Sequence, residues 1–509
     1  MIEGVLMEND SGTALSRRRL LGAIAGLFIL RALPSREQPG SAAISPVMTR
    51  LSSYMAKAHV EALPDDVIEQ TKCHVLDTLA AMLSGSRLCP GVAAIDFARA
   101  NSKDRTATVV ASNVRCSASE AALINGMLAH SDETDDSHAP SQSHPGCAVV
   151  PSALAAAEQL KVDGTSFLRA VTLGYDIGTR VTLTFGGPKF QTDTHRSTHA
   201  LAGLFGAAAA AGSIMHLTAQ QMRWLLDYSA QQASGIAAWQ RDTEHIEKAF
   251  VFAGMPARGG ITAALLVHSG WTGVDDILAG PDNFIAAFAP LADPAGLIDQ
   301  LGERYEITRT NIKKWTVGSP IQAPLDALED LRAKYGFDAS QVQSVTVRVA
   351  TQEAAVVDNR EMPDICLQHL IAVILVDKTV TFDSAHDRSR MQDPTILRVR
   401  NKVKLIPDQE LDRLLPQRVA VVEVALGSGR TLMKRVDAVR GTAQNPMTRD
   451  EVIAKCRDLA IPVLGAGDVA KLIDCVFALE SEGSFHKMIR LLSASNSVRI
   501  QNRRPAPCP

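Results

Sequence analysis

The sequence predicts a mainly α-helical protein with one smaller α+β part, and three observations support this fold class. Aromatic residues make up only 5% of the 509 residues, while alanine is abundant, which favours closely packed helices. Helical spacing dominates residues 45–312, and strand-like alternation follows only after Lys313. A helical pattern then returns near the C-terminus. We therefore expect a large all-helical domain, an α+β domain that follows it or is inserted in it, and a C-terminal helical return.

The predicted domain boundaries follow these changes of pattern. Residues 1–44 are predicted to form a signal-like or disordered segment, 45–312 the first part of the helical domain, 313–440 the α+β domain, 441–500 the helical return, and 501–509 a disordered tail. A chain of this length is sufficient for two or three domains with sizeable cores.

The N-terminal segment resembles an export signal. Arg17, Arg18 and Arg19 precede an apolar run from Leu20 to Leu30, and paired arginines before such a run are typical of twin-arginine signals. The run is too short for a comfortable membrane span. We expect export of the folded protein to the periplasm, with a cytoplasmic location as the alternative. An anchor helix and a poorly ordered start-site segment are the other interpretations of this run.

Within residues 45–312 the expected helices have recognisable ends. In "LPDDVIEQTKCHVLDTLAAMLSG", Pro64 and two aspartates occupy the first turn, and Gly85 ends the helix. In "SASEAALINGML", Ser117 and Glu120 have the spacing of a capping box. The stretch 202–215, "AGLFGAAAAAGSIM", carries almost no polar side chain, so we expect it to lie buried in the centre of a bundle.

The pattern changes in the second half of the chain. "QSVTVRVA" alternates valines with polar residues, which is typical of a strand. "RVAVVEVALGSGRTLMKRVD" contains two β-rich runs around the Gly-Ser-Gly at 427–429, which indicates a hairpin. Helical signals resume where Thr448 and Glu451 repeat the spacing of a capping box.

The composition argues against several classes of function. A formal net charge of -3, with 21% charged residues, gives no sign of a nucleic-acid partner. None of the eight cysteines forms a C-x-x-C pair, so a zinc or iron–sulfur framework is not expected, and the cysteines do not resemble a disulfide scaffold. We predict that the protein uses no metal and no cofactor.

The most unusual stretch is "AHSDETDDSHAPSQSHPGCAVVPSALAAAEQL" at residues 129–160. Its first sixteen residues hold four carboxylates and three histidines, which could bind a metal, perform acid–base chemistry or form a solvated surface loop. These residues are His130, Asp132, Glu133, Asp135, Asp136, His138 and His144. They lack a recognised metal-ligand spacing such as H-E-x-x-H, which favours acid–base chemistry over a metal site.

Several motifs, taken in order, resemble the MmgE/PrpD family, which includes 2-methylcitrate dehydratases, cis-aconitate decarboxylases and related epimerases. The resemblance covers most of residues 45–492. It rests on the loop ending in "SHPG" before an alanine-rich helix, and on "GYDIGTRV", "HALAGLFGAAAAAG", "EKAFVFAGMPARGGITAALL", "IKKWTVGSPIQAPLDAL" and "NPMTRDEV". It implies a helical domain made from both chain ends, an α+β lid domain, and usually a homodimer. It also implies a metal-free site between the two domains that acts on di- and tricarboxylates.

The resemblance implies roles for four residues of the loop. His144 matches the histidine of the family's His-Pro motif, and Glu133 stands where the family has its catalytic aspartate. Ser137 takes the place of a threonine and keeps the hydroxyl group. These three are candidate catalytic residues. Asp136 belongs to a paired-aspartate feature, and we assign it to substrate binding.

Other candidate residues lie further along the chain. The family keeps one histidine before the apolar helix, for which we prefer His195 as a catalytic residue, with His199 as the alternative. Lys248 aligns with a family lysine after a shift of one residue, and Lys313 matches the lysine that opens the lid. Arg258 follows Lys248 and could bind a carboxylate bidentately. We assign Lys248, Arg258 and Lys313 to substrate binding.

Two positions depart from the family's pattern. Phe252 stands where the family often has a histidine, and His369 stands where it commonly has a tyrosine. We retain His369 as a catalytic candidate because histidine and tyrosine both exchange protons. Asp132 and His138 are expected to be peripheral.

The resemblance therefore predicts a cofactor-independent dehydratase that acts on a small, 2-methylcitrate-like hydroxy-polycarboxylate. A carboxylate or a histidine would remove the α-proton, cationic side chains would bind the substrate carboxylates, and a protonated histidine would assist the loss of hydroxide. The alternatives are a decarboxylase or epimerase with a related substrate, and a non-catalytic binding protein of the same fold. We expect no nucleic-acid partner and no stable membrane span.

Overall fold

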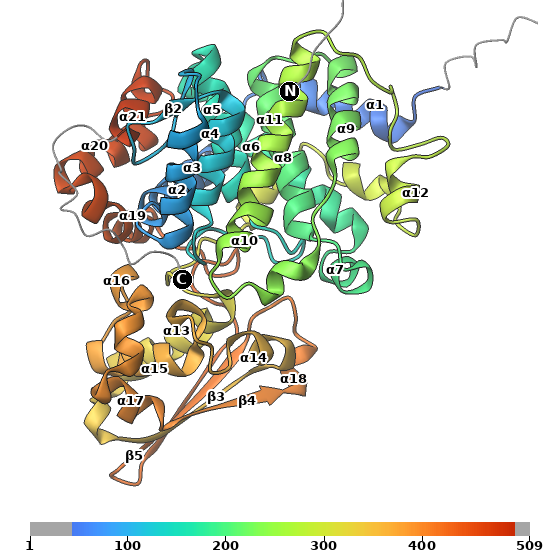
Figure 1. Cartoon of the computed structure of the whole chain (residues 1–509). Coiled ribbons are helices and arrows are strands. Elements are labelled where there is room, and N and C mark those ends of the chain that lie inside the picture. The colour runs from blue at the N-terminus through green and yellow to red at the C-terminus, as the bar shows by residue number, and fades with distance from the viewer. Residues whose placement is uncertain (1–42, 494–509) are drawn as a thin grey trace, which may run out of the picture. The chain divides into compact units, whose positions relative to one another are not determined.

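The computed structural model describes residues 43–493 of the chain. The predicted export signal and the predicted C-terminal tail therefore lie outside the described residues. Within 43–493 the chain is mainly helical, and its strands form a two-stranded and a four-stranded sheet. The predicted fold class is confirmed, because the four-stranded sheet lies between two helical stretches of the chain (Figure 1).

The helical stretches at residues 46–312 and 449–492 form what we call the helical body. Its first stretch contains α1 (Pro46–Lys57), α2 (Asp65–Gly85), α3 (Cys89–Asn101), α4 (Ala118–Ala129), α5 (Gly146–Leu160), α6 (Gly164–Phe185), α7 (Pro188–Thr194), α8 (Thr198–Ile214), α9 (Ala219–Gln232), α10 (Ile246–Ala249), α11 (Met255–His268) and α12 (Phe284–Phe288), with a short hairpin of β1 (Ala107–Thr108) and β2 (Arg115–Cys116). Its second stretch contains α19 (Arg449–Leu464), α20 (Ala466–Phe477) and α21 (Ser484–Leu492).

Local sequence explains where several of these helices begin and end. The predicted capping boxes at Ser117 and Thr448 are both present, each with its glutamate three residues on. The helix α2 ends at the predicted Gly85. A Cβ atom at this position would lie 2.0 Å from the carbonyl oxygen of Leu128, so the missing side chain allows α4 to pack against the end of α2.

The helix α8 forms the centre of the helical body. All of its residues are buried, which confirms the prediction for the apolar stretch at 202–215. It packs against α5, α6, α9 and α11. The packing against α6 is close because Gly178 lacks a side chain: a Cβ there would lie 2.3 Å from the carbonyl oxygen of Ala202.

The two ends of the described chain meet in the helical body. The helix α19 packs along α2, and Figure 1 shows this contact between the end and the beginning of the fold. Val452 and Leu459 of α19 belong to the same hydrophobic core as Leu76 of α2. The body is therefore complete only when α19, α20 and α21, the last helices of the described residues, are in place.

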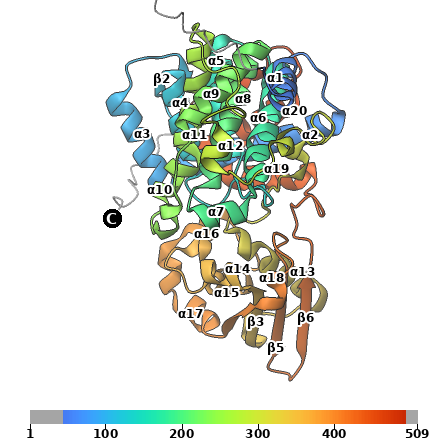
Figure 2. The same cartoon turned by 90° about the vertical axis from the view of Figure 1, so that its right-hand side faces the viewer.

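Residues 313–440 form the α+β part, which we call the lid. Its sheet has the strand order β4-β3-β5-β6, with β3 parallel to β4 and antiparallel to β5, and β5 antiparallel to β6. Figure 2 shows β3, β5 and β6 side by side. The strands are β3 (Val342–Ala350), β4 (Val403–Asp408), β5 (Ala420–Leu426) and β6 (Thr431–Val436), and the helices are α13 (Gln322–Tyr335), α14 (Thr351–Val357), α15 (Leu367–Asp377), α16 (Phe382–His386), α17 (Pro394–Arg400) and α18 (Gln409–Asp412).

The lid has its own hydrophobic core, but one of its helices docks on the helical body. Valines of β3 and β5 pack with α13 and α15 in the core of the lid. Phe382 of α16 belongs instead to the core of the helical body. Its backbone N–H donates to Asp458 of α19 at 2.9 Å, and Arg87 pairs with Asp383 at 3.0 Å. The helix α16 thus fixes one edge of the lid.

Within residues 43–493, one helical run at 246–268 is long and apolar enough to cross a membrane, and a second run qualifies only if α2 and α3 are joined across their 82° bend. In the first run, 61% of the apolar window is buried against the rest of the protein. Packing in the helical body therefore explains its apolar character.

The close packing of α6 on α8 predicts that a larger residue at Gly178 destabilises the protein. We expect Gly178→Ala to lower the free energy of unfolding by about 1–3 kcal/mol, because the new methyl group meets backbone that cannot move aside. The matched control is Gly467→Ala in α20, where no described atom outside the adjoining backbone of its own helix lies within 4 Å of the new Cβ, and a gain of about 0.4–1 kcal/mol is expected. Denaturant unfolding of both variants checks this, and equal effects would contradict it.

Candidate active site

The loop between α4 and α5 is buried, although it carries many titratable groups. Each of its seven carboxylate and imidazole side chains belongs to a residue with at most 8% of its surface exposed. Two β-bridges hold the loop, one between Ser137 and Asn311 and one between His138 and Ser143. The burial excludes a solvated surface loop, one of the three interpretations that the sequence left open.

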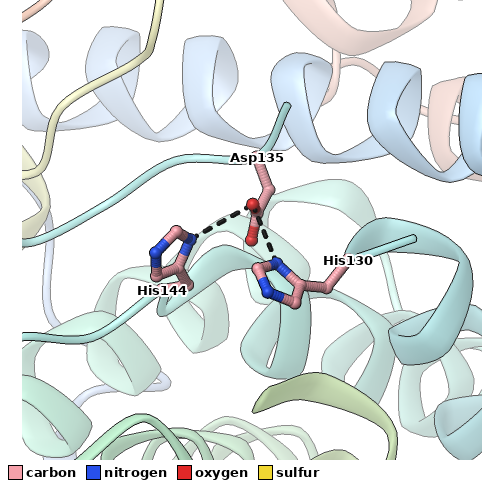
Figure 3. Close-up of side chains that lie close together, drawn as sticks. All are labelled: His130, Asp135 and His144. Carbon is pink, nitrogen blue, oxygen red and sulfur yellow. Dashed lines mark hydrogen bonds and ion pairs between the residues drawn. The ribbon is translucent and has the colours of Figure 1, made fainter. Parts of the chain in front are cut away.

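Asp135 lies at the centre of the loop, between two imidazoles (Figure 3). Its Oδ1 atom is 3.0 Å from Nδ1 of His130 and 3.1 Å from Nδ1 of His144. Burial alone would raise the pKa of Asp135, but the two imidazoles lower it well below its usual range. An ionised carboxylate only accepts hydrogen bonds, so each histidine donates from Nδ1 and, when neutral, keeps a lone pair on Nε2.

His144 is suited to accept a proton. Burial lowers its pKa, and the neighbouring Lys313 and His130 lower it further, while Asp135 acts in the opposite direction. The imidazole is therefore neutral near pH 7. Asp135 would stabilise the imidazolium ion that forms when Nε2 takes up a proton.

Two lysines converge on Glu133. Nζ of Lys248 forms an ion pair with the carboxylate of Glu133. Nζ of Lys313 donates to the backbone carbonyl of Glu133 at 2.7 Å and lies 3.5 Å from its Oε2 atom. Burial alone would raise the pKa of Glu133, but Lys248 and Lys313 hold it well below its usual range. The ammonium groups bring positive charge to a buried place, which suits an anionic ligand.

A wall of aromatic rings completes the cluster. The ring of Phe252 stacks on His199 with centroids 3.7 Å apart and on His130 with centroids 4.6 Å apart. The ring of His199 lies 5.3 Å from that of His144, and His245 lies 5.0 Å from His130. Burial lowers the pKa of His199 and of His245 well below the usual range, and Lys248 contributes to both shifts.

A π-helical turn at Phe250–Gly254 places Phe252 in this wall. A π turn adds one residue to a helix without changing its direction. With this turn in place, Lys248 and Phe252 both face the cluster, and Nζ of Lys248 lies 5.2 Å from the centroid of the Phe252 ring.

The lid contributes a contact to the same loop. Nε2 of His386, at the end of α16, lies 2.9 Å from Oδ2 of Asp132. Burial alone would lower the pKa of His386, but Asp132, together with Asp364, raises it to about 9. Asp132 is thus not peripheral in position, because it joins the loop to the lid.

Asp136 and Lys455 also hold the loop in place through contacts with the surrounding helices. Asp136 accepts from Tyr175 at 2.5 Å and from the backbone N–H of Gly146 at 3.0 Å, and it lies 2.8 Å from Nδ1 of His74. Lys455 of α19 donates to the carbonyl of Thr134 at 2.9 Å, and forms a buried ion pair with Asp77 at 2.6 Å. Asp136 therefore supports the loop and presents no oxygen that is unused.

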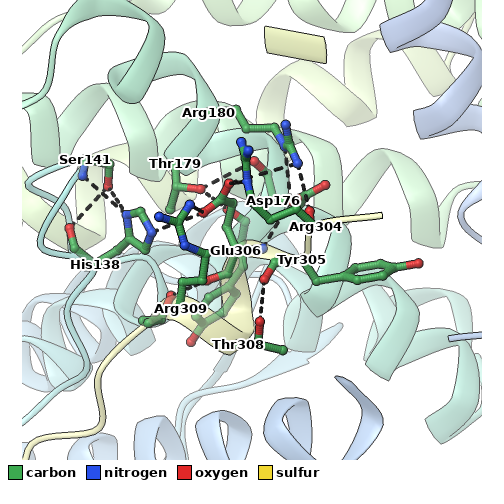
Figure 4. A network of polar contacts seen from close by, with 12 residues as sticks. His138, Ser141, Asp176, Thr179, Arg180, Arg304, Tyr305, Glu306, Thr308 and Arg309 are labelled. Carbon is green, nitrogen blue, oxygen red and sulfur yellow. Dashed lines mark hydrogen bonds and ion pairs between the residues drawn. The ribbon is translucent and has the colours of Figure 1, made fainter. Parts of the chain in front are cut away.

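His138, in the middle of the loop, contacts an ionic network that is centred on the buried carboxylate of Glu306 (Figure 4). Its Nε2 atom lies 3.3 Å from Glu306, which also pairs with Arg304 at 2.7 Å and Arg309 at 3.0 Å. Glu306 precedes the segment that leads into the lid, and its backbone N–H donates to Asp176 of α6. This network fixes the position of the segment that carries Lys313.

The structure brings together His144, Glu133, Lys248 and Lys313 among the residues predicted from the sequence. His195 is exposed at the end of α7, and His199 lies in the cluster instead. Arg258 is exposed on α11. These positions favour His199 over His195 as the histidine that belongs to the candidate site.

Ser137 and His369, the other two residues that the sequence predicted as catalytic, are not among the clustered side chains. Ser137 lines a cavity of about 120 Å³ that also touches Lys313 and Arg418 between loop and lid. His369 is fully buried in α15, and neither ring nitrogen has a hydrogen-bond partner among residues 43–493. Burial, with Arg400 and Arg390 of the lid, lowers its pKa to about 4.

Two groups of side chains in the cluster have the spacing of metal ligands. They are His130, Asp135 and His144, and His130, Glu133 and His245, with ligand atoms within 4.8 Å of one another. Lys248 and Lys313 already neutralise Glu133, and Lys313 also lies 3.9 Å from Asp135. Their charges oppose a bound cation and favour a bound anion.

Comparisons with known proteins identify the family of this chain. A profile described as the MmgE/PrpD N-terminal domain matches residues 49–296, and one described as the MmgE/PrpD C-terminal domain matches residues 315–480. The chain is 26% identical to a cis-aconitate decarboxylase of Homo sapiens over 470 residues, which cover 87% of this chain and 94% of that protein. It is 22% identical to a cis-aconitate decarboxylase of Aspergillus terreus over 497 residues, which cover 90% of this chain and 98% of that protein. It is 23% identical to the cis-aconitate decarboxylase-like protein oryM of Aspergillus oryzae over 477 residues, which cover 88% of this chain and 97% of that protein.

The ion pair between lid and loop predicts a pH-dependent stability. The pKa of His386 is raised to about 9, so its stabilising contribution is complete below its unfolded pKa of about 6.5 and is lost as the pH rises through 9. We expect His386→Gln to cost at most about 3 kcal/mol near pH 6, and progressively less toward pH 10.

Thermal unfolding of wild type and His386→Gln between pH 6 and pH 10 measures this difference. The matched control is His486→Gln, because His486 is an exposed histidine of α21. A difference between wild type and His386→Gln that stays constant over this range would show that the ion pair does not hold the lid.

Proposed function

Because the chain belongs to the MmgE/PrpD family, we propose that it is a lyase that dehydrates a small, 2-methylcitrate-like hydroxy-polycarboxylate by means of side chains alone. The observation that carries this proposal is the buried contact between Nδ1 of His144 and the carboxylate of Asp135, which leaves Nε2 of His144 available as a base. It lies in the same buried cluster as two lysines. A base beside cationic groups is what proton removal next to a carboxylate requires.

The lysines would bind the substrate carboxylates. In the free protein both lysines pair with Glu133, and a substrate carboxylate would compete with Glu133 for them. Each ammonium group is more effective here than at the surface, because the cluster is buried and water does not screen it. The same charges would stabilise the negative charge that develops on the substrate when a proton is removed.

Proton transfer would begin at Nε2 of His144. The histidine takes the proton from the carbon next to a bound carboxylate, and Asp135 stabilises the resulting imidazolium ion. The bond between the neighbouring carbon and its hydroxyl group then breaks with its electron pair on oxygen, and the leaving hydroxide takes a proton from the imidazolium ion and departs as water, which restores the neutral histidine. The products are an unsaturated polycarboxylate and water.

Decarboxylation is the second candidate, since the relatives named above are cis-aconitate decarboxylases. The same lysines would bind the carboxylates of an unsaturated acid, and a protonated imidazole would deliver a proton to carbon while carbon dioxide leaves. Epimerisation would begin, as dehydration does, with removal of the proton from the carbon next to a carboxylate. A non-catalytic binding protein would bind the acids without turnover.

A substrate screen separates these functions. Purified protein, treated with a chelator, is incubated with 2-methylcitrate, citrate and cis-aconitate, and the products are identified by mass spectrometry. Loss of water from a hydroxy acid supports the dehydratase, while loss of carbon dioxide from cis-aconitate supports the second candidate. Binding without any product would support the non-catalytic alternative.

We predict that His144→Ala folds and binds the substrate but loses about 10²- to 10⁴-fold in kcat. Because the pKa of His144 is lowered, the wild-type rate should remain constant to below pH 6.5 and fall only in more acidic solution. The control is Lys314→Ala, which should be mild because Lys314 pairs with Glu329 on the lid. Near-normal turnover by folded His144→Ala would remove this residue from the mechanism.

The two histidines near the start of α8 give a further test. We expect His199→Ala to reduce kcat/KM by at least about tenfold, because His199 lies in the ring cluster beside His144. His195→Ala should have little effect, because His195 is exposed. Steady-state kinetics of the two variants decide between them, and the opposite result would restore the preference that the sequence suggested.

A further inference from the structure

We propose that His245 is a substrate-contacting residue that recognises the hydroxyl group of the substrate. The inference rests on the proposed function, since it assigns a residue to the hydroxyl that a dehydratase removes. It follows from the backbone that holds this side chain, from its unused ring nitrogen, and from the charges beside it.

The backbone of His245 is held in an uncommon conformation that fixes its side chain. Its φ of 62° lies in the left-handed region, which residues other than glycine seldom adopt. Asp242 stabilises the turn, because its carboxylate accepts from the backbone N–H of Glu244 and of Lys248, each at 2.9 Å. The carbonyl of His245 accepts from Ala249 at 3.1 Å. Such conformations cost free energy and often occur at functional sites.

The side chain of His245 lies in the cluster with an unpaired nitrogen. The residue is 5% exposed, and within the described part of the chain its Nε2 atom has no hydrogen-bond partner. A ligand atom of its ring lies within 4.8 Å of one of His130 and one of Glu133. Buried polar atoms are nearly always paired in proteins, so an unpaired nitrogen inside a binding site indicates a partner supplied by the ligand.

The neighbouring charges determine which ligand group suits His245. Burial, and after it the charge of Lys248 three residues on, lowers the pKa of His245 well below its usual range, so the imidazole is neutral. A carboxylate of the substrate would bind the lysines in preference to His245, because hydrogen bonds between charged groups are stronger than those to a neutral imidazole. A hydroxyl group both donates and accepts, so it can pair with either tautomer of a neutral imidazole.

The inference predicts selectivity between two acids that differ by one hydroxyl group. Citrate carries a hydroxyl group on its central carbon, whereas tricarballylate has the same three carboxylates and lacks it. We expect wild type to bind citrate at least about tenfold more tightly, because tricarballylate leaves Nε2 unpaired. In His245→Leu the two affinities should become equal, mainly through weaker binding of citrate.

Isothermal titration of the full chain with each acid, in the presence of a chelator, measures both affinities. His245→Asn is the second variant, since asparagine tolerates the left-handed conformation and keeps the variant folded if leucine does not. His216→Gln is the matched control, because His216 is also left-handed (φ 51°) but exposed and outside the cluster. It should bind both acids as wild type does.

The outcomes separate this inference from the proposed function. Equal affinities in wild type, or a preference for citrate that persists in both His245 variants, would overturn the role of His245 and leave the polycarboxylate site in place. Binding of neither acid by wild type would overturn the polycarboxylate site and this inference with it. A preference for citrate in wild type and His216→Gln that is lost in the His245 variants supports the inference.

Discussion

The buried carboxylate of Asp135 is the group on which the rest of the site depends. An ionised side chain in the interior is tolerated only when hydrogen bonds and opposite charges compensate for its lost hydration. The imidazoles of His130 and His144 supply the hydrogen bonds, and Lys313 adds positive charge 3.9 Å away. These partners come from the end of α4, the start of α5 and the beginning of the lid. Satisfying one carboxylate therefore requires three parts of the fold to meet, and the same contacts fix which nitrogen of each histidine remains available.

Local patterns were sufficient to predict the fold class and the most important loop. Helix caps such as the one at Ser117, the apolar stretch that forms α8 and the alternation in β3 depend on nearby residues, so the sequence shows them directly. His144, Glu133, Lys248 and Lys313 were found because motifs in a fixed order resemble one family. The shift of one residue after Lys248 was also visible, but only the structure shows the π turn at Phe250–Gly254 that follows this lysine.

The remaining residues of the cluster depend on tertiary structure that no short pattern reveals. His195 and His199 are four residues apart, and the choice between them is decided by a positive φ at 195, which ends α7 before α8 begins. Arg258 is exposed because its neighbours Pro256, Ala257 and Gly260 occupy the buried face of α11. His245 lies in a turn more than a hundred residues from the loop, and His386 lies in the lid. Neither carries a sequence signal, because what makes each of them part of the site is a distance in space.

The contact between Lys455 and the loop has a consequence for the order in which the protein is made. Asp77 and the carbonyl of Thr134 are synthesised early, whereas the ammonium group that satisfies both belongs to a helix near the end of the chain. While the ribosome is still adding the lid, a buried carboxylate in α2 has no counterion and the loop lacks one of its anchors. A nascent chain can therefore contain every residue of the cluster and still be unable to assemble it. The cluster is thus held in place only after α19 has left the ribosome and packed along α2, although its other components are synthesised earlier.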